Sequence, residues 1–479
     1  MPALPPGPRD LPAVQMLRFL RDPFAFLETC TARYGDVFTA RFSGMPPIVY
    51  FHDPEAIREV FASSTAMTRA GEANAHLKFL LGPGSLLLLD GKRHERERRL
   101  LMSPFGGDRI ATYLDTMVAT THRFIEDAAS GQPFSLRDAM QSITLDVILS
   151  CIFGAESAQQ RETLAKPLKR LIALAASPAA MACGTLFDGA KFRQRLVSNI
   201  APAADRLASL GLGRAVPFGE LARAMRDVQE TLREHVREHR AAHKEGRADV
   251  LSMLIEARDE EGRALSDDDL RDELLTMLVG GHESTATTLT FALYTLCSRP
   301  DLLDKATAEL ARVTGHGPLT SKGAKELRYI EALIKETLRL YGATNGFGRK
   351  LAAPLRVGGF DLPEGVLITA SSYVLHRNPR IWPDPHRFDP ERFLDRRARL
   401  GEFIPFGGGA RTCLGMNMAM FEAKVIIATL LEHAKLRVLD APPVRLVQQG
   451  IFLGPSSSVP CVLEKVKAHS VAPARQPST

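Results

Sequence analysis

The chain has 479 residues, 45% hydrophobic and 24% charged, a composition typical of a globular protein with a large core. Its six cysteines include no CxxC pair, which excludes a zinc framework and a disulfide scaffold and favours a reducing compartment, the cytoplasm. The net charge of +6 fits either an ordinary solvated surface or a basic face for an acidic partner, and the absence of aromatics within the basic runs argues against nucleic acid.

The expected elements form one helix-rich domain. Residues 36–62 are predicted to form two strands around a Gly-Met-Pro-Pro turn, followed by a helix. The pattern is mostly helical from about residue 91 to 343, and a second β-rich patch follows at 355–372. No linker or repeat divides the chain, so we expect a single domain over residues 1–479, mainly α with minor β, with a disordered tail at about 470–479.

One long helix is expected to begin after Ser266, the predicted N-cap, and to end before Pro300. Gly280 and Gly281 lie in its middle, where each glycine costs about 1 kcal/mol relative to alanine. One explanation is close approach of a cofactor to bare backbone. Another is a bond from the Ser284 hydroxyl to the Gly280 carbonyl, which would widen the helix and open a small groove.

The same helix carries His282 and Glu283 in the most hydrophobic window of the chain. Charged groups are costly in lipid, so we expect no membrane anchor. A zinc-protease helix would need a second histidine at position 286, which is alanine, and His282 is expected to be a polar residue turned away from any cofactor.

The stretch FIPFGGGARTCLGMN, residues 403–417, places a cysteine behind three glycines and an arginine. The pattern Phe406-x-x-Gly409-x-Arg411-x-Cys413-x-Gly415 resembles the signature of the cytochrome P-450 superfamily at every position. The resemblance implies the cytochrome P-450 fold, with Cys413 as the thiolate ligand of iron in haem b. Glycines let the backbone approach the ring, and N–H groups of the loop and of a helix starting near Leu414 would support the thiolate.

Other haem-binding residues are implied by the same resemblance. Within the cysteine loop they are Phe406 and Gly407, and the residues expected at the propionates are His94, Arg98, Arg349 and Arg411. Arg93, Arg96 and Arg99, beside two of these, fit either an exposed basic helix or a docking surface for an electron donor.

A charge network behind the haem is also implied. Glu336 and Arg339 lie three residues apart, on one helical face, and Arg392 follows in "PERF". This order resembles the superfamily's Glu-x-x-Arg plus Arg triad. Buried charges persist only when paired, so the expected role is structural.

The segment "GGHES" resembles the superfamily's oxygen-handling motif, with serine where threonine is usual. The resemblance implies proton delivery by Glu283 and Ser284, and Thr285 follows directly. The serine keeps the hydroxyl but has freer rotamers than threonine, which makes water positioning looser.

The expected function is a haem-thiolate monooxygenase that takes O2 and two electrons from a ferredoxin-type donor with its reductase. The expected substrate is a lipophilic terpenoid, steroid or fatty acid, and the protein is expected to be a monomer. Its pocket would be lined by residues 70–89, 277–281, 343–347 and 449–455, with 168–187 either core helix or a lid. The alternatives are a peroxide-driven peroxygenase of the same fold and a non-catalytic haem-binding protein.

Overall fold

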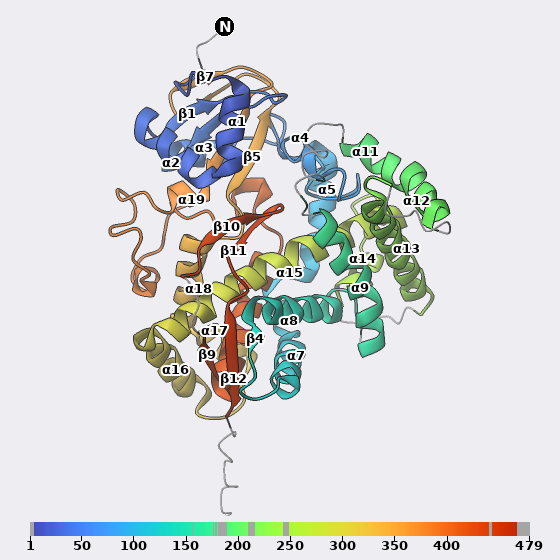
Figure 1. Cartoon of the computed structure of the whole chain (residues 1–479), viewed down its shortest axis with the longest axis vertical. Helices are drawn as coiled ribbons and strands as arrows, with labels where there is room; N and C mark the ends of the chain where they lie inside the picture. The colour runs from blue at the N-terminus through green and yellow to red at the C-terminus, as the bar shows by residue number, and fades with distance from the viewer. Residues whose placement is uncertain are drawn as a thin grey trace, which may run out of the picture.

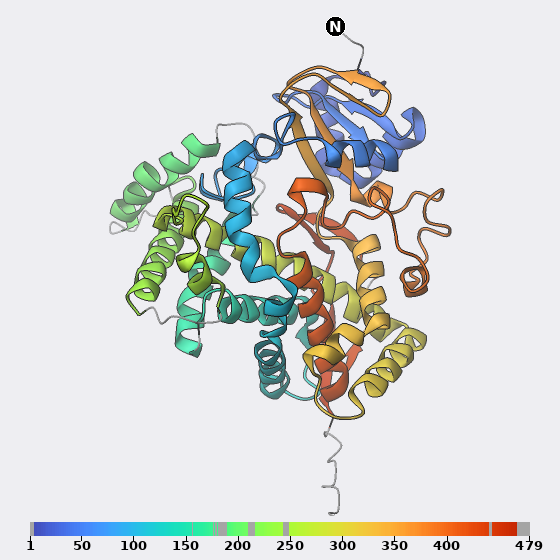
Figure 2. The same cartoon turned by 180° about the vertical axis from the view of Figure 1, so that it is seen from behind.

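The computed structural model describes residues 4–155, 157–175, 177, 180, 189–208, 216–242, 249–439 and 443–466. A large helical body is joined to a smaller lobe built around a sheet near the N-terminus, which we call the N-terminal lobe (Figures 1 and 2). The fold is mainly α with minor β, as predicted. The expected tail at about 470–479 lies outside the described residues.

The sheet of the N-terminal lobe joins strands that are far apart in the sequence. Its strand order is β1 (Val37–Ala40), β2 (Ile48–Phe51), β8 (Leu367–Ser371), β5 (Gly346–Leu351) and β3 (Thr68–Arg69). Strands β2 and β8 are parallel, and the other neighbours are antiparallel. The predicted pair of strands followed by a helix within 36–62 is confirmed, with α3 at Pro54–Ala62. The sheet therefore brings the second β-rich patch against the first.

Three smaller sheets complete the strand inventory of the described residues. Their strands are β4 (Phe134–Ser135), β12 (Pro460–Lys465) and β9 (Ala434–Val438) in one sheet, β10 (Leu446–Gln449) and β11 (Phe452–Pro455) in the second, and β6 (Leu355–Val357) and β7 (Phe360–Leu362) in the third.

The helices account for most of the described chain. Those used below are α1 (Pro12–Arg21), α2 (Pro23–Tyr34), α5 (Gly91–Met102), α8 (Leu136–Cys151), α9 (Ala158–Ala175), α13 (Gly219–Ala241), α15 (Asp267–Ser298), α18 (Arg328–Tyr341) and α20 (Met416–His433); the others are α4 (Ala70–Ala73), α6 (Gly107–Ala111), α7 (Leu114–Asp127), α11 (Gly189–Arg195), α12 (Ala201–Ala208), α14 (Val250–Glu256), α16 (Pro300–Thr314), α17 (Ser321–Glu326) and α19 (Ser372–Leu375). Within the described ranges, none is both long and apolar enough to cross a bilayer.

Helix α15 crosses the middle of the helical body (Figure 1). It has 32 residues, and the Ser266 hydroxyl caps it by accepting the N–H of Asp269, as predicted. It packs against α8, α13, α18 and α20, which is why it is buried on nearly every side.

The segment 168–187 was expected to be core helix or lid. Its first part belongs to α9, where Leu168, Leu171 and Ala175 are buried and the helix packs on α13. These residues are core helix. Residues 181–188 lie outside the described residues.

Candidate haem site

The cysteine loop is closed by its own backbone and pressed against α3. The N–H of Cys413 donates to the carbonyl of Phe406 at 2.9 Å. Gly407 and Gly409 have φ values of 68° and 66°, a region that favours glycine. A Cβ at Gly408 or Gly409 would come within about 2 Å of Phe61, at 2.1 Å and 2.0 Å. These glycines therefore let the loop dock on α3, a reason that the sequence did not reveal.

The thiol of Cys413 is exposed, although protein surrounds the loop. The surrounding protein removes water from the thiol, and this raises the pKa of Cys413. Hydrogen bonds from the N–H groups of Gly415 and Met416, and the charge of Arg98, lower the pKa. Helix α20 begins at Met416, slightly later than expected. The N–H groups of Gly415 and Met416, at its start, are directed at the sulfur. The loop thus provides an accessible sulfur with partners for a negative charge.

Four basic side chains come together from three separate segments. His94 on α5 is only 1% exposed, and its Nδ1 has no hydrogen-bond partner in the described structure. Burial, followed by the charges of Arg411, Arg98 and Arg349, lowers the pKa of His94 to about 3. Burial also lowers the pKa of Arg349 to about 10, and Arg411 adds to that effect. The cluster is a strongly cationic, partly buried environment suited to carboxylates.

All three arginines of the cluster have partners in the protein, and Arg349 donates through Nη1 to the carbonyl of Gly348 at 2.8 Å. Arg98 donates through Nη2 to the carbonyl of Thr412 at 2.7 Å, next to the cysteine. Arg411 donates to Oδ1 of Asp90 at 2.6 Å and to the carbonyl of Leu89 at 2.7 Å. Asp90 was not singled out from the sequence. Its place just before α5, in "DGKRH", was the available signal.

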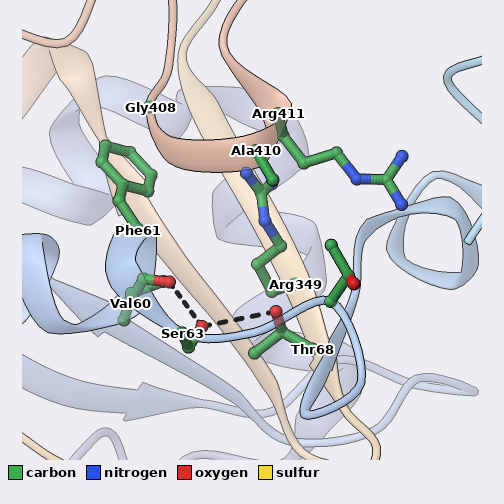
Figure 3. Close-up of a pocket in the computed structure, with 9 residues that line it drawn as sticks. Val60, Phe61, Ser63, Thr68, Arg349, Gly408, Ala410 and Arg411 are labelled. Atoms are coloured by element: carbon green, nitrogen blue, oxygen red, sulfur yellow. Dashed lines mark hydrogen bonds between the residues drawn. The ribbon is translucent and has the colours of Figure 1, made fainter. Parts of the chain in front are cut away.

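Arg349 and Arg411 also line a small pocket behind the cysteine loop (Figure 3). Arg349 extends toward Ala410, and Arg411 extends away from the loop. The pocket floor carries Ser63, whose hydroxyl donates to the Val60 carbonyl at 2.6 Å. The pocket therefore places these polar groups next to the two arginines.

The two glycines of α15 have different surroundings. A Cβ at Gly280 would meet nothing within 4 Å, whereas a Cβ at Gly281 would lie 2.7 Å from Cδ1 of Ile148 on α8. For Gly281 the structure gives a reason that neither explanation included, which is close packing of α15 on α8. Met277, Gly280 and Ser284 are partly accessible and lie at helical spacing, so they share one face of a helix whose middle is mostly buried.

The polar residues beside Gly280 are tied into the helix. Ser284 Oγ donates to the Gly280 carbonyl at 2.7 Å, the bond anticipated from the sequence, and Thr285 Oγ1 donates to the Gly281 carbonyl at 2.9 Å. Glu283 Oε1 accepts a 2.8 Å hydrogen bond from Nε2 of Gln141 on α8.

His282, next to Glu283, is held inside the protein. Its Nδ1 lies 2.7 Å from the Leu278 carbonyl, and burial lowers its pKa. It is therefore neutral at ordinary pH.

A buried ion pair lies on α18. Arg339 donates to Glu336 through Nε at 2.7 Å and Nη2 at 2.8 Å, and both side chains are fully buried. Arg392 Nε lies 3.5 Å from Glu336 Oε1. Burial raises the pKa of Glu336, and Arg339 opposes that rise. The three expected network residues are thus in contact.

Arg339 also binds the segment that leads to the cysteine loop. It donates to the carbonyls of His376 at 2.7 Å, Pro385 at 2.8 Å and Arg387 at 3.2 Å. One guanidinium therefore fixes the shape of a long irregular stretch.

The three other arginines of α5 are paired with acids. Arg93 bonds Glu97 and Asp269 at 2.8 Å, Arg96 pairs with Asp259, and Arg99 lies 3.5 Å from Glu260. These pairs favour a structural role for them over a docking surface.

The residues present fit a haem. An accessible sulfur suits iron, the open face at Gly280 leaves room beside α15, and the unpartnered His94 Nδ1 in a cationic cluster suits propionates.

Comparisons with known proteins identify the family of the chain. The family model "Cytochrome P450" matches residues 5–462. The curated protein "Putative cytochrome P450 135B1" of Mycobacterium tuberculosis is 34% identical over 90% of this chain and 85% of its own length. "Putative cytochrome P450 138" of Mycobacterium bovis is 31% identical over 96% of both chains.

Solved structures agree on the fold. "Retinoic acid bound cyanobacterial CYP120A1" superposes with a TM-score of 0.80 at 23% identity, covering 97% of this chain and all (100%) of its own. The cytochrome P450DA heme domain gives 0.79 at 21% identity, covering 98% and 99%.

The fold and the thiol-centred site define a haem-thiolate monooxygenase, an enzyme that uses O2 and electrons from a redox partner. The chain belongs to the cytochrome P450 family.

Proposed function

We propose that the protein hydroxylates or epoxidises a lipophilic small molecule of the terpenoid, steroid or fatty-acid kind. The observation that carries this proposal is the meeting of mainly apolar segments at α15. The Ser85 hydroxyl accepts a 2.8 Å hydrogen bond from the Thr276 hydroxyl on α15. The backbone N–H of Leu453 donates to the Ala343 carbonyl at 2.9 Å, and the Leu453 carbonyl accepts from the Thr287 hydroxyl at 3.3 Å. Residues 70–89, 343–347 and 449–455 are thereby gathered around the open face of the helix, with few charges to hold a polar substrate.

The group held by Cys413 is proposed to be a b-type haem, which when bound supplies the binding and activation of O2. His94, Arg98, Arg349 and Arg411 would hold its propionates, with Phe406 and Gly407 beside it. Glu283, Ser284 and Thr285 would move protons along α15. Glu336, Arg339 and Arg392 would keep the cysteine loop in place.

A ferredoxin-type protein with its reductase is the proposed electron source, and the protein is proposed to act as a cytoplasmic monomer. The net charge of +6 suits an acidic donor.

The first test measures the ferrous carbonyl spectrum of the purified holoenzyme. Thiolate ligation gives a red-shifted Soret band, and Cys413→Ala is expected to abolish it. A spectral binding screen of lipophilic compounds, with retinoic acid in the panel, then identifies the substrate class. Failure of every lipophilic compound to displace iron-bound water, with polar compounds succeeding, would overturn the substrate proposal.

The peroxygenase alternative is distinguished by the oxidant. Glu283 and Ser284 supply the acid and alcohol that peroxide-driven turnover does not need, so a ferredoxin-supported system should be faster than hydrogen peroxide alone. Equal rates would favour the peroxygenase. A non-catalytic protein would form no oxidation product with either oxidant.

A further inference from the structure

Helix α1 exposes an apolar face to solvent. Eight large hydrophobic side chains are strongly exposed in the described part of the chain, and half of them belong to this one helix and its N-cap: Leu11, Val14, Leu17 and Leu20, which are 72%, 37%, 68% and 68% exposed. Such a concentration marks an interaction site rather than ordinary surface scatter.

The exposure is built into the fold, because the other face of α1 is anchored. Gln15 is 1% exposed, and its Nε2 donates to the carbonyls of Pro8 at 3.1 Å and Asp10 at 2.8 Å. Its Oε1 accepts the N–H of Arg41 at 2.9 Å. Phe19 packs against Phe26 and Phe42, with ring centroids 5.8 Å and 5.0 Å away. The helix therefore cannot roll to bury its leucines without breaking this anchor.

Positive charges slightly outnumber negative ones on α1 and at its two ends. Arg9, Arg18 and Arg21 are exposed, and so are Asp10 and Asp22. Arg18 pairs with Asp10 at 2.7 Å, at the edge of the helix. The combination of exposed leucines and arginines on one short helix is characteristic of helices that lie in the surface of an anionic bilayer.

The shape of the face favours lipid over a protein partner. Val14, Leu17 and Leu20 are three residues apart and drift around the helix, so they cover a broad arc, and Arg21 lies within that arc, four residues after Leu17. A bilayer surface accepts a convex apolar arc without a matching groove. Figure 1 shows α1 in the N-terminal lobe, next to α2 and α3.

We propose that α1 docks the protein peripherally on anionic lipid membranes, with its leucines in the headgroup region and its arginines at the phosphates. The proposal is independent of the substrate class and needs no helix that crosses the bilayer.

The test is flotation of the purified, haem-loaded full chain with vesicles of phosphatidylcholine mixed with phosphatidylglycerol. We expect binding that weakens with added salt and is weaker on pure phosphatidylcholine. Leu17→Asp with Leu20→Asp should reduce partitioning by about tenfold or more. These side chains are exposed, so the carbonyl-adduct spectrum and thermal unfolding should stay unchanged.

The matched control is Leu394→Asp with Leu400→Asp, two leucines that are 45% and 49% exposed elsewhere on the surface. The control should float like the unmodified protein. Absence of binding to anionic vesicles, equal binding to both vesicle types, or equal loss in both variants would overturn the proposal. A dimer by light scattering that becomes monomeric in the Leu17→Asp, Leu20→Asp variant would instead assign the face to a second copy of the chain.

Discussion

Gln141 on α8 donates a 2.8 Å hydrogen bond to the carboxylate of Glu283 on α15. The bond holds the proposed proton-routing acid toward a neighbouring helix, so Gln141 is a positioning residue for Glu283. Replacing Glu283 by Gln keeps the size of the side chain but removes the acid. We expect turnover to fall about 100-fold, with a larger solvent isotope effect. Gln141→Leu should give a smaller loss, and an equal loss in both variants would contradict direct proton transfer by Glu283.

The Ser284 hydroxyl, bonded to the Gly280 carbonyl, should be needed for coupling rather than for stability. Ser284→Ala is expected to divert electrons to peroxide, because a water beside Gly280 would lose its hydroxyl partner. Ser284→Thr should restore or improve coupling. The measurement is the ratio of product formed to reductant consumed, and unchanged coupling in the alanine variant would exclude this role.

The two glycines of α15 should respond in opposite ways to alanine. Gly281→Ala is expected to lower the free energy of unfolding by about 1–3 kcal/mol, because its methyl group would meet Ile148 Cδ1 at 2.7 Å. Ile148→Val in the same chain should recover part of that loss. Gly280→Ala should not destabilise the fold, but should change substrate-binding spectra because its methyl group points into open space. Denaturant unfolding and spectral titration separate the two effects.

Removal of Arg339 should destabilise the protein by about 3–5 kcal/mol, because Glu336 would stay buried without its bidentate partner. Arg392→Met should cost less, since its Nε lies 3.5 Å from Glu336. Arg328→Met, at an exposed position of the same helix, is the control. Chemical denaturation measures the order, and equal effects of Arg339→Met and Arg328→Met would contradict it.

Glu422 on α20 should make stability depend on pH. It is 2% exposed, its Oε1 has no hydrogen-bond partner among the described residues, and burial raises its pKa to about 8. The folded state therefore binds this proton more tightly than the unfolded chain, whose pKa is about 4.3. The contribution of this carboxyl group to the free energy of unfolding is therefore fully present below the unfolded-state pKa, and it is lost as the pH rises through the folded-state pKa of about 8. Glu422→Gln should unfold at a higher temperature than the unmodified protein at pH 9, with little difference at pH 5. Glu326→Gln, at an exposed site, should show no such trend.

Local pattern predicted the elements whose determinants lie close together in the sequence. The cap at Ser266, the strands within 36–62 and the Ser284–Gly280 bond all depend on residues close in the sequence, where spacing fixes geometry. The partners that join distant segments were missed.

Asp90 for Arg411, Gln141 for Glu283 and Ile148 for Gly281 become neighbours only when whole helices pack. No hydrophobic periodicity or sequence motif identifies such pairs. The glycines at 408 and 409 show the same limit, because their need arises from Phe61, far back in the chain.

The irregular stretch before the cysteine loop owes its order to Arg339, which gathers carbonyls from His376, Pro385 and Arg387. The Arg339 guanidinium there plays the part that strand-to-strand hydrogen bonds play in a sheet. The segment from His376 to Arg387 should therefore unfold together with α18. When Arg339 is replaced, the backbone amides of this segment should lose protection from hydrogen exchange together, as one unit.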